Sequence, residues 1–293
     1  MRLQNVRGIA MVIGAMKSGT TSLFWALKGH PQLAIAPTKE VNFFACPERW
    51  GRGPDWYDSQ FSFDPSVHRW ALDGSTDQTK FPYTDYALDR MQRFDDVRWK
   101  FLYLIRHPLR RIESHHRHAH QTGAELLRFQ ALDQDFSFDH RISPVAIDVS
   151  RYAFQLDHYA ERWGKDSVKI VVFEELIKDW ENQVRSIRQF LEIDDSLPIP
   201  EKEHQNNRSQ RTVPSESYKA LRSIAPLRAL GSMVPKTAKH ALRDRMINPD
   251  ELPRFKLNAA EEVELLDKLR GDLRRLHDVY GVDVEGNWGI SLS

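Results

Sequence analysis

The 293-residue chain contains a single cysteine, Cys46. One thiol excludes an intramolecular disulfide and is typical of proteins that remain in a reducing compartment. The chain must therefore fold on its hydrophobic core alone. Its composition allows this, because 41% of the residues are hydrophobic and eight are tryptophan. No covalent staple and no structural metal is needed for folding.

Long apolar runs and an excess of one charge are also missing. No stretch approaches the roughly 20 apolar residues of a membrane-spanning helix. The first eight residues, MRLQNVRG, lead straight into an apolar run and leave no room for a signal peptide. Because 42 Lys and Arg face 41 Asp and Glu, bulk charge gives no reason to expect nucleic acid or an anionic membrane as partner. We therefore expect a cytoplasmic protein without a membrane span.

The apolar segments that are present alternate between strand-like and helical patterns. Strand-like runs occupy 9–14, 33–36, 69–73, 101–106 and 168–173. Helical patterns begin after Pro108 and cover 151–163, 179–191 and 259–279. This alternation is the signature of an α/β fold with a central parallel sheet flanked by crossover helices. We predict one domain over 1–293, with a core at 8–192 and a helical region at 196–293.

The C-terminal region carries weaker patterns. Residues 196–217 are polar and proline-bearing, which predicts a loop. Residues 236–250 are basic and helical in pattern; they either attract an anionic acceptor or form a solvated helix face, and we favour the solvated face. The helix at 259–279 has the clearest signals, with Asn258 as N-cap, Glu261 three residues on and Gly281 after its end.

The most informative segment lies between the first strand and the first helix. Gly14 and Gly19 have the glycine spacing of a Walker A loop, but Lys17 precedes the second glycine where a Walker A lysine would follow it. The start of a helix after a glycine turn binds anions through its amides and its dipole. The lysine and four hydroxyl side chains add further donors. We therefore predict a phosphate-like ligand here, without the usual nucleoside triphosphate chemistry.

A second candidate anion site follows the strand at 101–106. Arg106 comes just after the end of that strand, which is where parallel α/β sheets bind ligands. Ser114 falls about two turns into the next helix, on a face that can look back to the arginine. Guanidinium and hydroxyl together suit a second phosphate. The alternative is a surface arginine with an incidental serine.

Two further groups have weaker claims to a function. Glu40, in the segment 39–44, would lie near the glycine loop as a base that takes a proton from an attacking hydroxyl, or would only complement a helix dipole. The histidines of the segment 113–120 include the i,i+4 pair His116 and His120, for which a metal site is conceivable. No acidic partner supports the metal, and a polar helix face is the better interpretation.

Taken together, these motifs resemble those of sulfotransferases that use 3′-phosphoadenosine 5′-phosphosulfate (PAPS). The resemblance covers roughly residues 8–192 and is nearest the heparan-sulfate-like and bacterial branch, whose KE-x-x-FF stretch is similar to residues 39–44. It implies a P-loop-like sulfotransferase fold and Glu40 as candidate base. It also implies PAPS contacts from a set of residues: Lys17, Ser18, Gly19, Thr20, Thr21, Ser22 and, for the 3′-phosphate, Arg106 and Ser114.

The sequence also departs from that family. Heparan-sulfate members carry a lysine soon after the third strand, and the residue at the corresponding position is Gly74. The membrane anchor and cysteine pair of Golgi members are missing. The late glycine-rich phosphate loop of cytosolic members is absent too, and residues 206–209 occupy its place, so that Arg208 or Arg211 is expected to help hold the 3′-phosphate.

The resemblance implies in-line transfer of a sulfonate from PAPS to a hydroxyl or amine of a carbohydrate or small-molecule acceptor, without a metal. Lys17 and the loop amides would stabilise the charge on the bridging oxygen. Two alternatives remain. One is a P-loop kinase or NTPase, for which Asp73 is the candidate magnesium-binding aspartate. The other is an inactive nucleotide-binding scaffold. Seven aromatic residues wall an acceptor cleft or belong to the core, which is the commoner case: Trp25, Phe43, Phe44, Trp50, Trp56, Tyr57 and Phe81.

Overall fold

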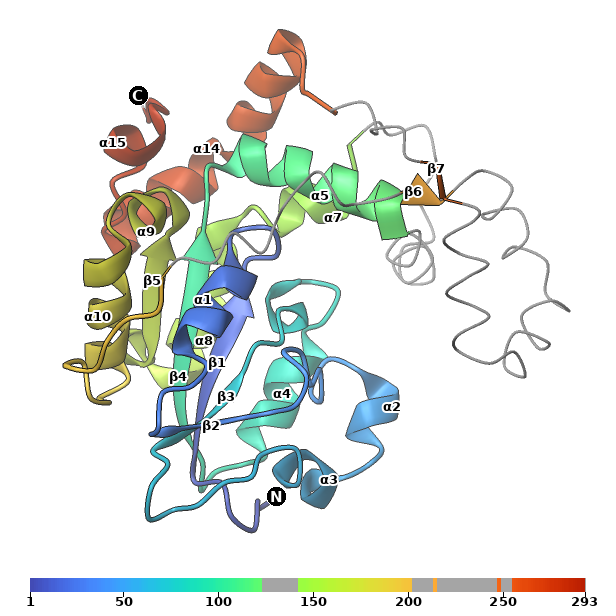
Figure 1. Cartoon of the computed structure of the whole chain (residues 1–293). Coiled ribbons are helices and arrows are strands. Elements are labelled where there is room, and N and C mark those ends of the chain that lie inside the picture. Colours follow the sequence, from blue (N-terminus) through green and yellow to red (C-terminus); the bar gives the residue numbers. More distant parts are fainter. Residues whose placement is uncertain (123–141, 202–212, 215–246, 249–254, 293) are drawn as a thin grey trace, which may run out of the picture.

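The computed structural model of the chain describes residues 1–122, 142–201, 213–214, 247–248 and 255–292. Its centre is a five-stranded sheet in the order β2-β3-β1-β4-β5, and all four pairs of neighbouring strands are parallel (Figure 1). The strands are β1 (Gly8–Gly14), β2 (Leu33–Ile35), β3 (Trp70–Asp73), β4 (Arg98–Ile105) and β5 (Val168–Val172). The predicted α/β class and parallel sheet are confirmed.

Alternate residues of the central strands face opposite sides of the sheet, as the two-residue period of a strand requires. On one side, Met11 of β1 and Phe101 of β4 belong to the larger hydrophobic core. On the other side, Val12 and Leu102 belong to a second core. Both faces are therefore buried, which is why these strands are continuously apolar in sequence.

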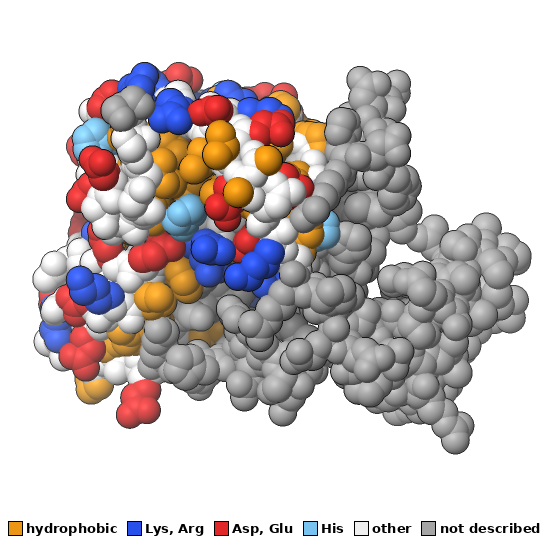
Figure 2. Space-filling view, turned by 90° about the horizontal axis from the view of Figure 1, so that it is seen from above, with side chains coloured by type: hydrophobic (Ala, Val, Ile, Leu, Met, Phe, Trp, Pro, Cys, Tyr) orange, Lys and Arg blue, Asp and Glu red, His pale blue; other side chains and the backbone are white. Residues whose placement is uncertain are grey.

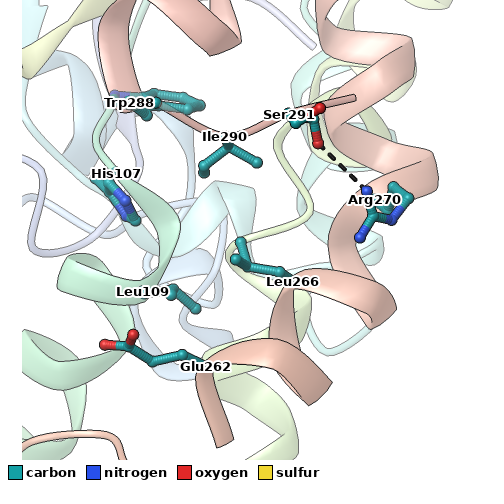
Figure 3. Close-up of a pocket in the computed structure, with 9 residues that line it drawn as sticks. His107, Leu109, Glu262, Leu266, Arg270, Trp288, Ile290 and Ser291 are labelled. Carbon is teal, nitrogen blue, oxygen red and sulfur yellow. Dashed lines mark hydrogen bonds between the residues drawn. The ribbon is translucent and has the colours of Figure 1, made fainter. Parts of the chain in front are cut away.

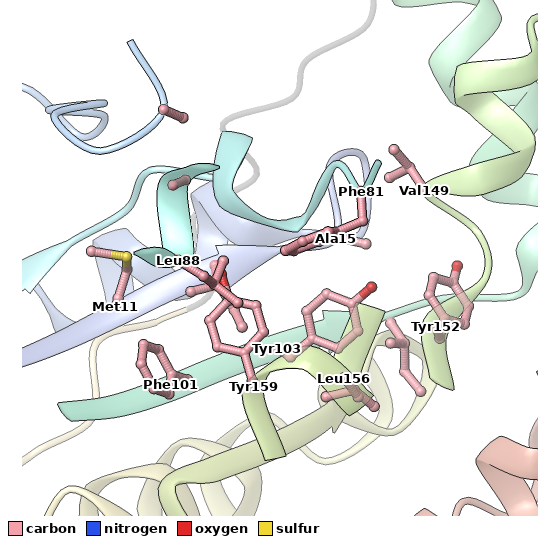
Figure 4. Packing of buried hydrophobic residues seen from close by; sticks show 14 of the residues in the cluster. Met11, Ala15, Phe81, Leu88, Phe101, Tyr103, Val149, Tyr152, Leu156 and Tyr159 are labelled. Atoms are coloured by element: carbon pink, nitrogen blue, oxygen red, sulfur yellow. The ribbon is translucent and has the colours of Figure 1, made fainter. Parts of the chain in front are cut away.

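Helices cover both faces (Figure 1). The second core is closed by α1 (Thr20–Leu27) and α10 (Trp180–Phe190). The larger core is closed by α4 (Tyr86–Gln92), α8 (Tyr152–Trp163) and α14 (Ala259–Tyr280). Figure 4 shows the aromatic packing between β4 and α8, where the rings of Phe101 and Tyr159 lie 4.8 Å apart.

The remaining elements connect these layers. They are α2 (Pro47–Trp50), α3 (Pro54–Asp58), η1 (Asp77–Thr79), α5 (Pro108–Thr122), α7 (Pro144–Asp148), η2 (Lys165–Ser167), α9 (Phe173–Lys178) and α15 (Val284–Trp288), with the antiparallel pair β6 (Val213–Pro214) and β7 (Ile247–Asn248). Among the helices of the described part of the chain, none is long and apolar enough to cross a bilayer.

The predicted boundaries of the sheet strands hold to within one residue except at the start of β4. β4 begins at Arg98, three residues before the predicted start, because Arg98, Trp99 and Lys100 continue the register with β1. Phe173 does not end β5 but begins α9. The C-terminal helix has the predicted capping box, in which the Asn258 side chain accepts from the Glu261 amide at 2.9 Å. Of the basic segment 236–250, which was predicted to be helical, the structure describes only Ile247 and Asn248, and these form a strand that pairs with Val213 and Pro214.

Candidate anion-binding and transfer site

The loop between β1 and α1 has the backbone that its sequence suggests. Lys17 has φ 72° and Gly19 has φ 91°, both in the left-handed region. A Cβ at Gly19 would lie 2.6 Å from Cδ2 of Phe173, so that only glycine fits there. Left-handed backbone at a non-glycine residue is rare and gathers at ligand-binding sites. The loop therefore turns tightly and brings the chain to the start of α1.

The start of α1 fits an anion. Within the described residues no side chain caps the helix at its N-cap residue, Gly19, and the first turn contains no acidic residue. The Ser18 hydroxyl is fully buried and has no hydrogen-bond partner among the side chains and backbone that the structure describes. A buried hydroxyl without a partner is costly unless a ligand satisfies it. Amides, hydroxyl and helix dipole together match a phosphate or sulfate group.

Hydrogen bonds from neighbouring elements fix the loop. The Ala15 amide donates to the Leu104 carbonyl at 2.5 Å, and the Ser18 amide donates to the Ala15 carbonyl at 3.1 Å. Arg111, fully buried in α5, donates from Nη1 to the Met16 carbonyl at 3.3 Å. The anion site is thus held from β4 and α5 before any ligand arrives, which preorganises its donors.

Arg106 lies at the predicted place, directly after β4. The peptide unit that follows it is held at both polar atoms: the Tyr152 hydroxyl donates to the Arg106 carbonyl at 2.7 Å, and the His107 amide donates to Glu174 Oε1 at 3.1 Å. Trp288 Nε1 donates to the other oxygen of Glu174 at 3.0 Å. These contacts fix the turn from which the Arg106 side chain projects.

Phe173 links the two predicted anion sites. The Arg106 guanidinium carbon lies 4.9 Å from the centre of the Phe173 ring, and the same ring closes the space above Gly19. One ligand that reaches both sites would therefore pass this aromatic ring. In the sequence, Phe173 is only the last residue of the strand-like run 168–173, and no local pattern marks it as a site residue.

For the other residues predicted to bind phosphate, the structure gives the element and the burial of each side chain. Ser114 lies half-buried on α5, and Thr21 and Ser22 are half-buried in the first turn of α1, where Thr20 is buried. Arg208 and Arg211 lie outside the described residues.

Glu40 is linked to the start of α1 through its neighbour Lys39. Lys39 Nζ lies 2.8 Å from Glu40 Oε1 and 3.5 Å from Thr20 Oγ1. The segment that carries this pair is attached to the loop after β3, because the Gly74 amide donates to the Lys39 carbonyl and the Asn42 amide donates to Ser75 Oγ, at 2.9 and 2.7 Å. Lys39 was not predicted as a site residue.

Asp73, the candidate magnesium-binding residue of the kinase alternative, has a structural role. Its carboxylate is fully buried and accepts from the Tyr57 hydroxyl at 3.0 Å and from the Ser75 amide at 2.9 Å. Burial raises the pKa of Asp73, and the hydrogen bonds from Ser75 and Tyr57 oppose that rise. Both oxygens are engaged in holding the loop that carries the Lys39–Glu40 segment.

Of the histidines of α5, the structure describes the side chains of His115 and His116, and these two contact different residues; the side chains of His118 and His120 lie outside the described part. His115 Nδ1 lies 3.2 Å from Arg111 Nη1, and the His116 ring stacks on Phe255 at 3.6 Å. In the described part of the chain no group of three or more His, Cys, Asp or Glu side chains has metal-binding geometry.

The predicted aromatic residues divide mainly in favour of the core. Phe43, Phe44, Tyr57 and Phe81 are buried in the larger core, and Trp50 and Trp56 pack against it. Trp25 packs against the second core.

A cavity of about 340 Å³ opens near the Arg106 turn (Figure 3). His107 and Leu109 line one side, and Leu266 and Arg270 of α14 line another. It contains none of the predicted site residues. Figure 2 views the side of the molecule at which the strands end, and Lys and Arg side chains gather near the middle of that face.

Comparisons with known proteins agree with this geometry. Residues 9–228 match the family model described as the sulfotransferase domain. A human heparan sulfate glucosamine 3-O-sulfotransferase 6 is 26% identical over 189 residues, which cover 62% of this chain and 51% of that protein. A membrane-associated sulfotransferase, kil1, from Dictyostelium discoideum is 32% identical over 137 residues, or 46% of this chain and 27% of that protein. The chain thus spans about half or less of the length of these relatives.

A solved structure has the same fold. The sulfotransferase from Alicyclobacillus acidocaldarius superimposes with a TM-score of 0.62 at 20% identity, over 96% of this chain and 98% of that one. A five-stranded parallel sheet, a glycine turn that opens onto an uncapped helix, and a family match over three quarters of the chain lead to one conclusion. The chain belongs to the sulfotransferase family.

Proposed function

We propose that the donor is PAPS and that the acceptor is a hydroxyl or amine of a carbohydrate or small molecule. One observation carries the proposal: the Lys39–Glu40 pair lies against Thr20 at the uncapped start of α1. A base thus stands beside an anion site, which is the arrangement that transfer of an anionic group to a hydroxyl requires.

The residues divide the work of transfer. Glu40, whose side chain is 40% exposed, accepts the proton of the acceptor hydroxyl. Lys17, the Ser18 hydroxyl and the first amides of α1 bind the 5′-phosphosulfate and stabilise the charge that grows on the bridging oxygen. Arg106 and Ser114, with Arg208 as a further candidate, hold the 3′-phosphate through charge-assisted hydrogen bonds. When bound, PAPS supplies a sulfonate whose bond to a 5′-phosphate oxygen breaks, with its electron pair left on that oxygen.

The acceptor class rests on likeness alone. The human relative is named for glucosamine of heparan sulfate, and the aromatic residues that suggested a sugar-stacking cleft are mostly core residues here. A panel of hydroxylated and amino acceptors with labelled PAPS identifies the acceptor and separates O- from N-sulfation.

The kinase alternative has less support. Lys17 precedes Gly19, and both oxygens of Asp73 are engaged in hydrogen bonds. Calorimetry with adenosine 3′,5′-bisphosphate (PAP) and ATP separates the two. We expect PAP to bind at least about tenfold more tightly, because only PAP places a phosphate at Arg106. Tight binding of ATP without binding of PAP contradicts the proposal.

Glu40→Gln tests the base. We expect kcat to fall by about 10²–10⁴-fold, the range for loss of a general base, while PAP affinity stays unchanged. Glu48→Gln is the matched control, because Glu48 is an exposed carboxylate of the neighbouring helix α2. If Glu40→Gln retains wild-type turnover, the base lies elsewhere; if no acceptor is turned over even by the wild type, the scaffold alternative holds.

A further inference from the structure

Lys39 has an unusual position for a lysine. Its side chain is only 14% exposed, and its ammonium lies between the carboxylate of Glu40 at 2.8 Å and the hydroxyl of Thr20 at 3.5 Å. An ammonium has three N–H donors, and these two acceptors take two of them. Water screens a charge this buried less than a surface charge, so that the attraction of Lys39 for an anion at α1 is stronger than that of an exposed lysine.

Gly74 makes this position possible. A Cβ at residue 74 would lie 2.8 Å from Cγ of Lys39, 2.8 Å from Cδ2 of Phe24 and 2.9 Å from the Lys39 carbonyl oxygen. The space that a side chain would need is therefore filled by the stem of Lys39. The Gly74 amide also donates to the Lys39 carbonyl at 2.9 Å, which holds the two segments at this distance.

The direction of the side chain is set by the same contacts. The Lys39 stem packs over Gly74 beside Phe24 of α1, and its ammonium reaches the first turn of that helix. Lys17 belongs to the glycine loop that leads into the same helix, two residues before its N-cap residue Gly19. Two separate segments that meet at the start of α1 thus each carry a lysine, and the candidate base Glu40 is next to Lys39.

We propose that Lys39 is a second cation of the site, besides Lys17, and contacts the sulfonate during transfer. The inference rests on the proposed function. Lys39 neutralises charge on the sulfonate oxygens as the bond to sulfur changes partner, and its bond to Glu40 aims that carboxylate at the acceptor.

PAP and PAPS differ only by the sulfonate, so their affinities isolate this contact. We measure both by calorimetry without acceptor, for the wild type and for Lys39→Met. Because one charge-assisted contact is lost, we expect Lys39→Met to weaken PAPS about tenfold and to leave PAP within about twofold. In the acceptor assay, kcat falls about 10²–10³-fold, as for removal of one donor from an oxyanion site.

Two variants serve as controls. Lys39→Arg keeps the charge, and we expect its PAPS affinity within about threefold of the wild type. Lys28→Met removes an exposed lysine just after α1, which lies over the Trp25 ring, and we expect no change in either affinity.

Gly74→Ala is a second test of the contact between Gly74 and the Lys39 side chain. The added methyl group displaces the Lys39 stem, so that PAPS affinity falls in the wild-type background but does not fall further in Lys39→Met. Thermal unfolding of each variant accompanies the titrations. Additive losses in the double variant overturn the pairing of Gly74 with Lys39.

The outcomes separate this inference from the proposed function. If the wild type binds neither PAP nor PAPS, the donor is wrong and the inference falls with it. If the wild type binds both and Lys39→Met binds PAPS equally well, or loses PAP and PAPS to the same extent, only the role of Lys39 is overturned.

Discussion

Two glycines shape the site at the scale of single residues, each for a different reason. Gly19 has a left-handed backbone and the Phe173 ring against it, whereas Gly74 is needed only for the space that the Lys39 stem occupies. Gly19 is required by the conformation of the turn, whereas Gly74 is required by the neighbouring Lys39 side chain. Substitutions at the two positions therefore have different consequences.

Gly19→Ala is expected to damage the loop in two ways. The alanine pays for a left-handed backbone, about 1–2 kcal/mol, and its Cβ meets Phe173 at 2.6 Å. Because the loop must shift to relieve the contact, we expect PAP affinity to fall more than about tenfold, since a displaced loop loses several donors at once. Urea unfolding and calorimetry measure the two effects.

Gly29→Ala is the matched control for this variant. Gly29 has φ 94°, almost the same backbone as Gly19, but nothing lies within 4 Å of the added Cβ. It should lose the same backbone free energy and keep its PAP affinity. If both variants lose affinity alike, the Phe173 contact is not what fixes the loop.

Some residues of the candidate site could be predicted from the sequence and others could not. Lys17, Glu40 and Arg106 could be selected from local patterns, because each follows a strand or a turn that the sequence itself marks. Lys39 and Phe173 could not, because their importance comes from contacts with Thr20, Gly19 and Arg106 across the fold. No local pattern distinguishes such a residue from its neighbours.

At the scale of elements, α8 and α9 hold the turn after β4. Tyr152 of α8 and Glu174 of α9 bind the two ends of one peptide unit, between Arg106 and His107. Trp288 of α15 joins the same carboxylate. Three helices, one of them near the end of the described chain, therefore determine where the Arg106 side chain begins.

Tyr152→Phe tests this arrangement. It removes one hydroxyl from a buried ring and frees the Arg106 carbonyl. We expect a stability loss of about 1–2 kcal/mol and, because the arginine is no longer held, a PAP affinity about three- to tenfold lower.

Tyr159→Phe provides the comparison. Tyr159 is also fully buried on α8, and its hydroxyl donates to the Gln78 carbonyl at 3.1 Å. It should lose similar stability and no affinity. Equal affinity losses in the two variants would mean that α8 acts through packing and not through Arg106.

The elements themselves were largely predictable. The core strands are apolar on both faces, and their ends are marked by glycine, proline or charge; α14 has a complete capping box. The misplaced start of β4 and the unexpected start of α9 have one cause. Arg98 and Phe173 are assigned by pairing and packing with distant segments, which the residues themselves do not record.

At the scale of the whole molecule, α14 attaches the C-terminal part of the described chain to α8, one of the helices that cover the central sheet. Asp272 of α14 accepts from the amides of Ala153 and Phe154 at 3.1 and 2.8 Å, at the N-terminus of α8. In the other direction, Asp157 of α8 pairs with Arg275 of α14 at 2.7 Å. Each of the two helices thus supplies one carboxylate to the contact between them.

The two carboxylates should impose opposite pH dependences on stability. Burial raises the pKa of Asp272 to about 6, and the hydrogen bonds from Phe154 and Ala153 only partly oppose this. A raised pKa means that the folded state holds the proton more tightly, so that the stabilisation is complete below about pH 4 and is lost as pH rises through 6, on the order of 3 kcal/mol in all.

Asp272→Asn should therefore remove a fall in unfolding free energy between pH 4 and 7, measured by urea unfolding at pH steps against the wild type.

Asp157→Asn should behave in the opposite way. Burial raises the pKa of Asp157, but hydrogen bonds from Arg275 and Tyr280 lower it on balance, so that its stabilisation is present at neutral pH and is lost as pH falls through its folded pKa. For each variant we plot against pH the unfolding free energy of the wild type minus that of the variant. This difference should fall with rising pH for Asp272→Asn and rise with pH for Asp157→Asn. Parallel slopes would show that the α8–α14 contact does not place Asp272 out of reach of water.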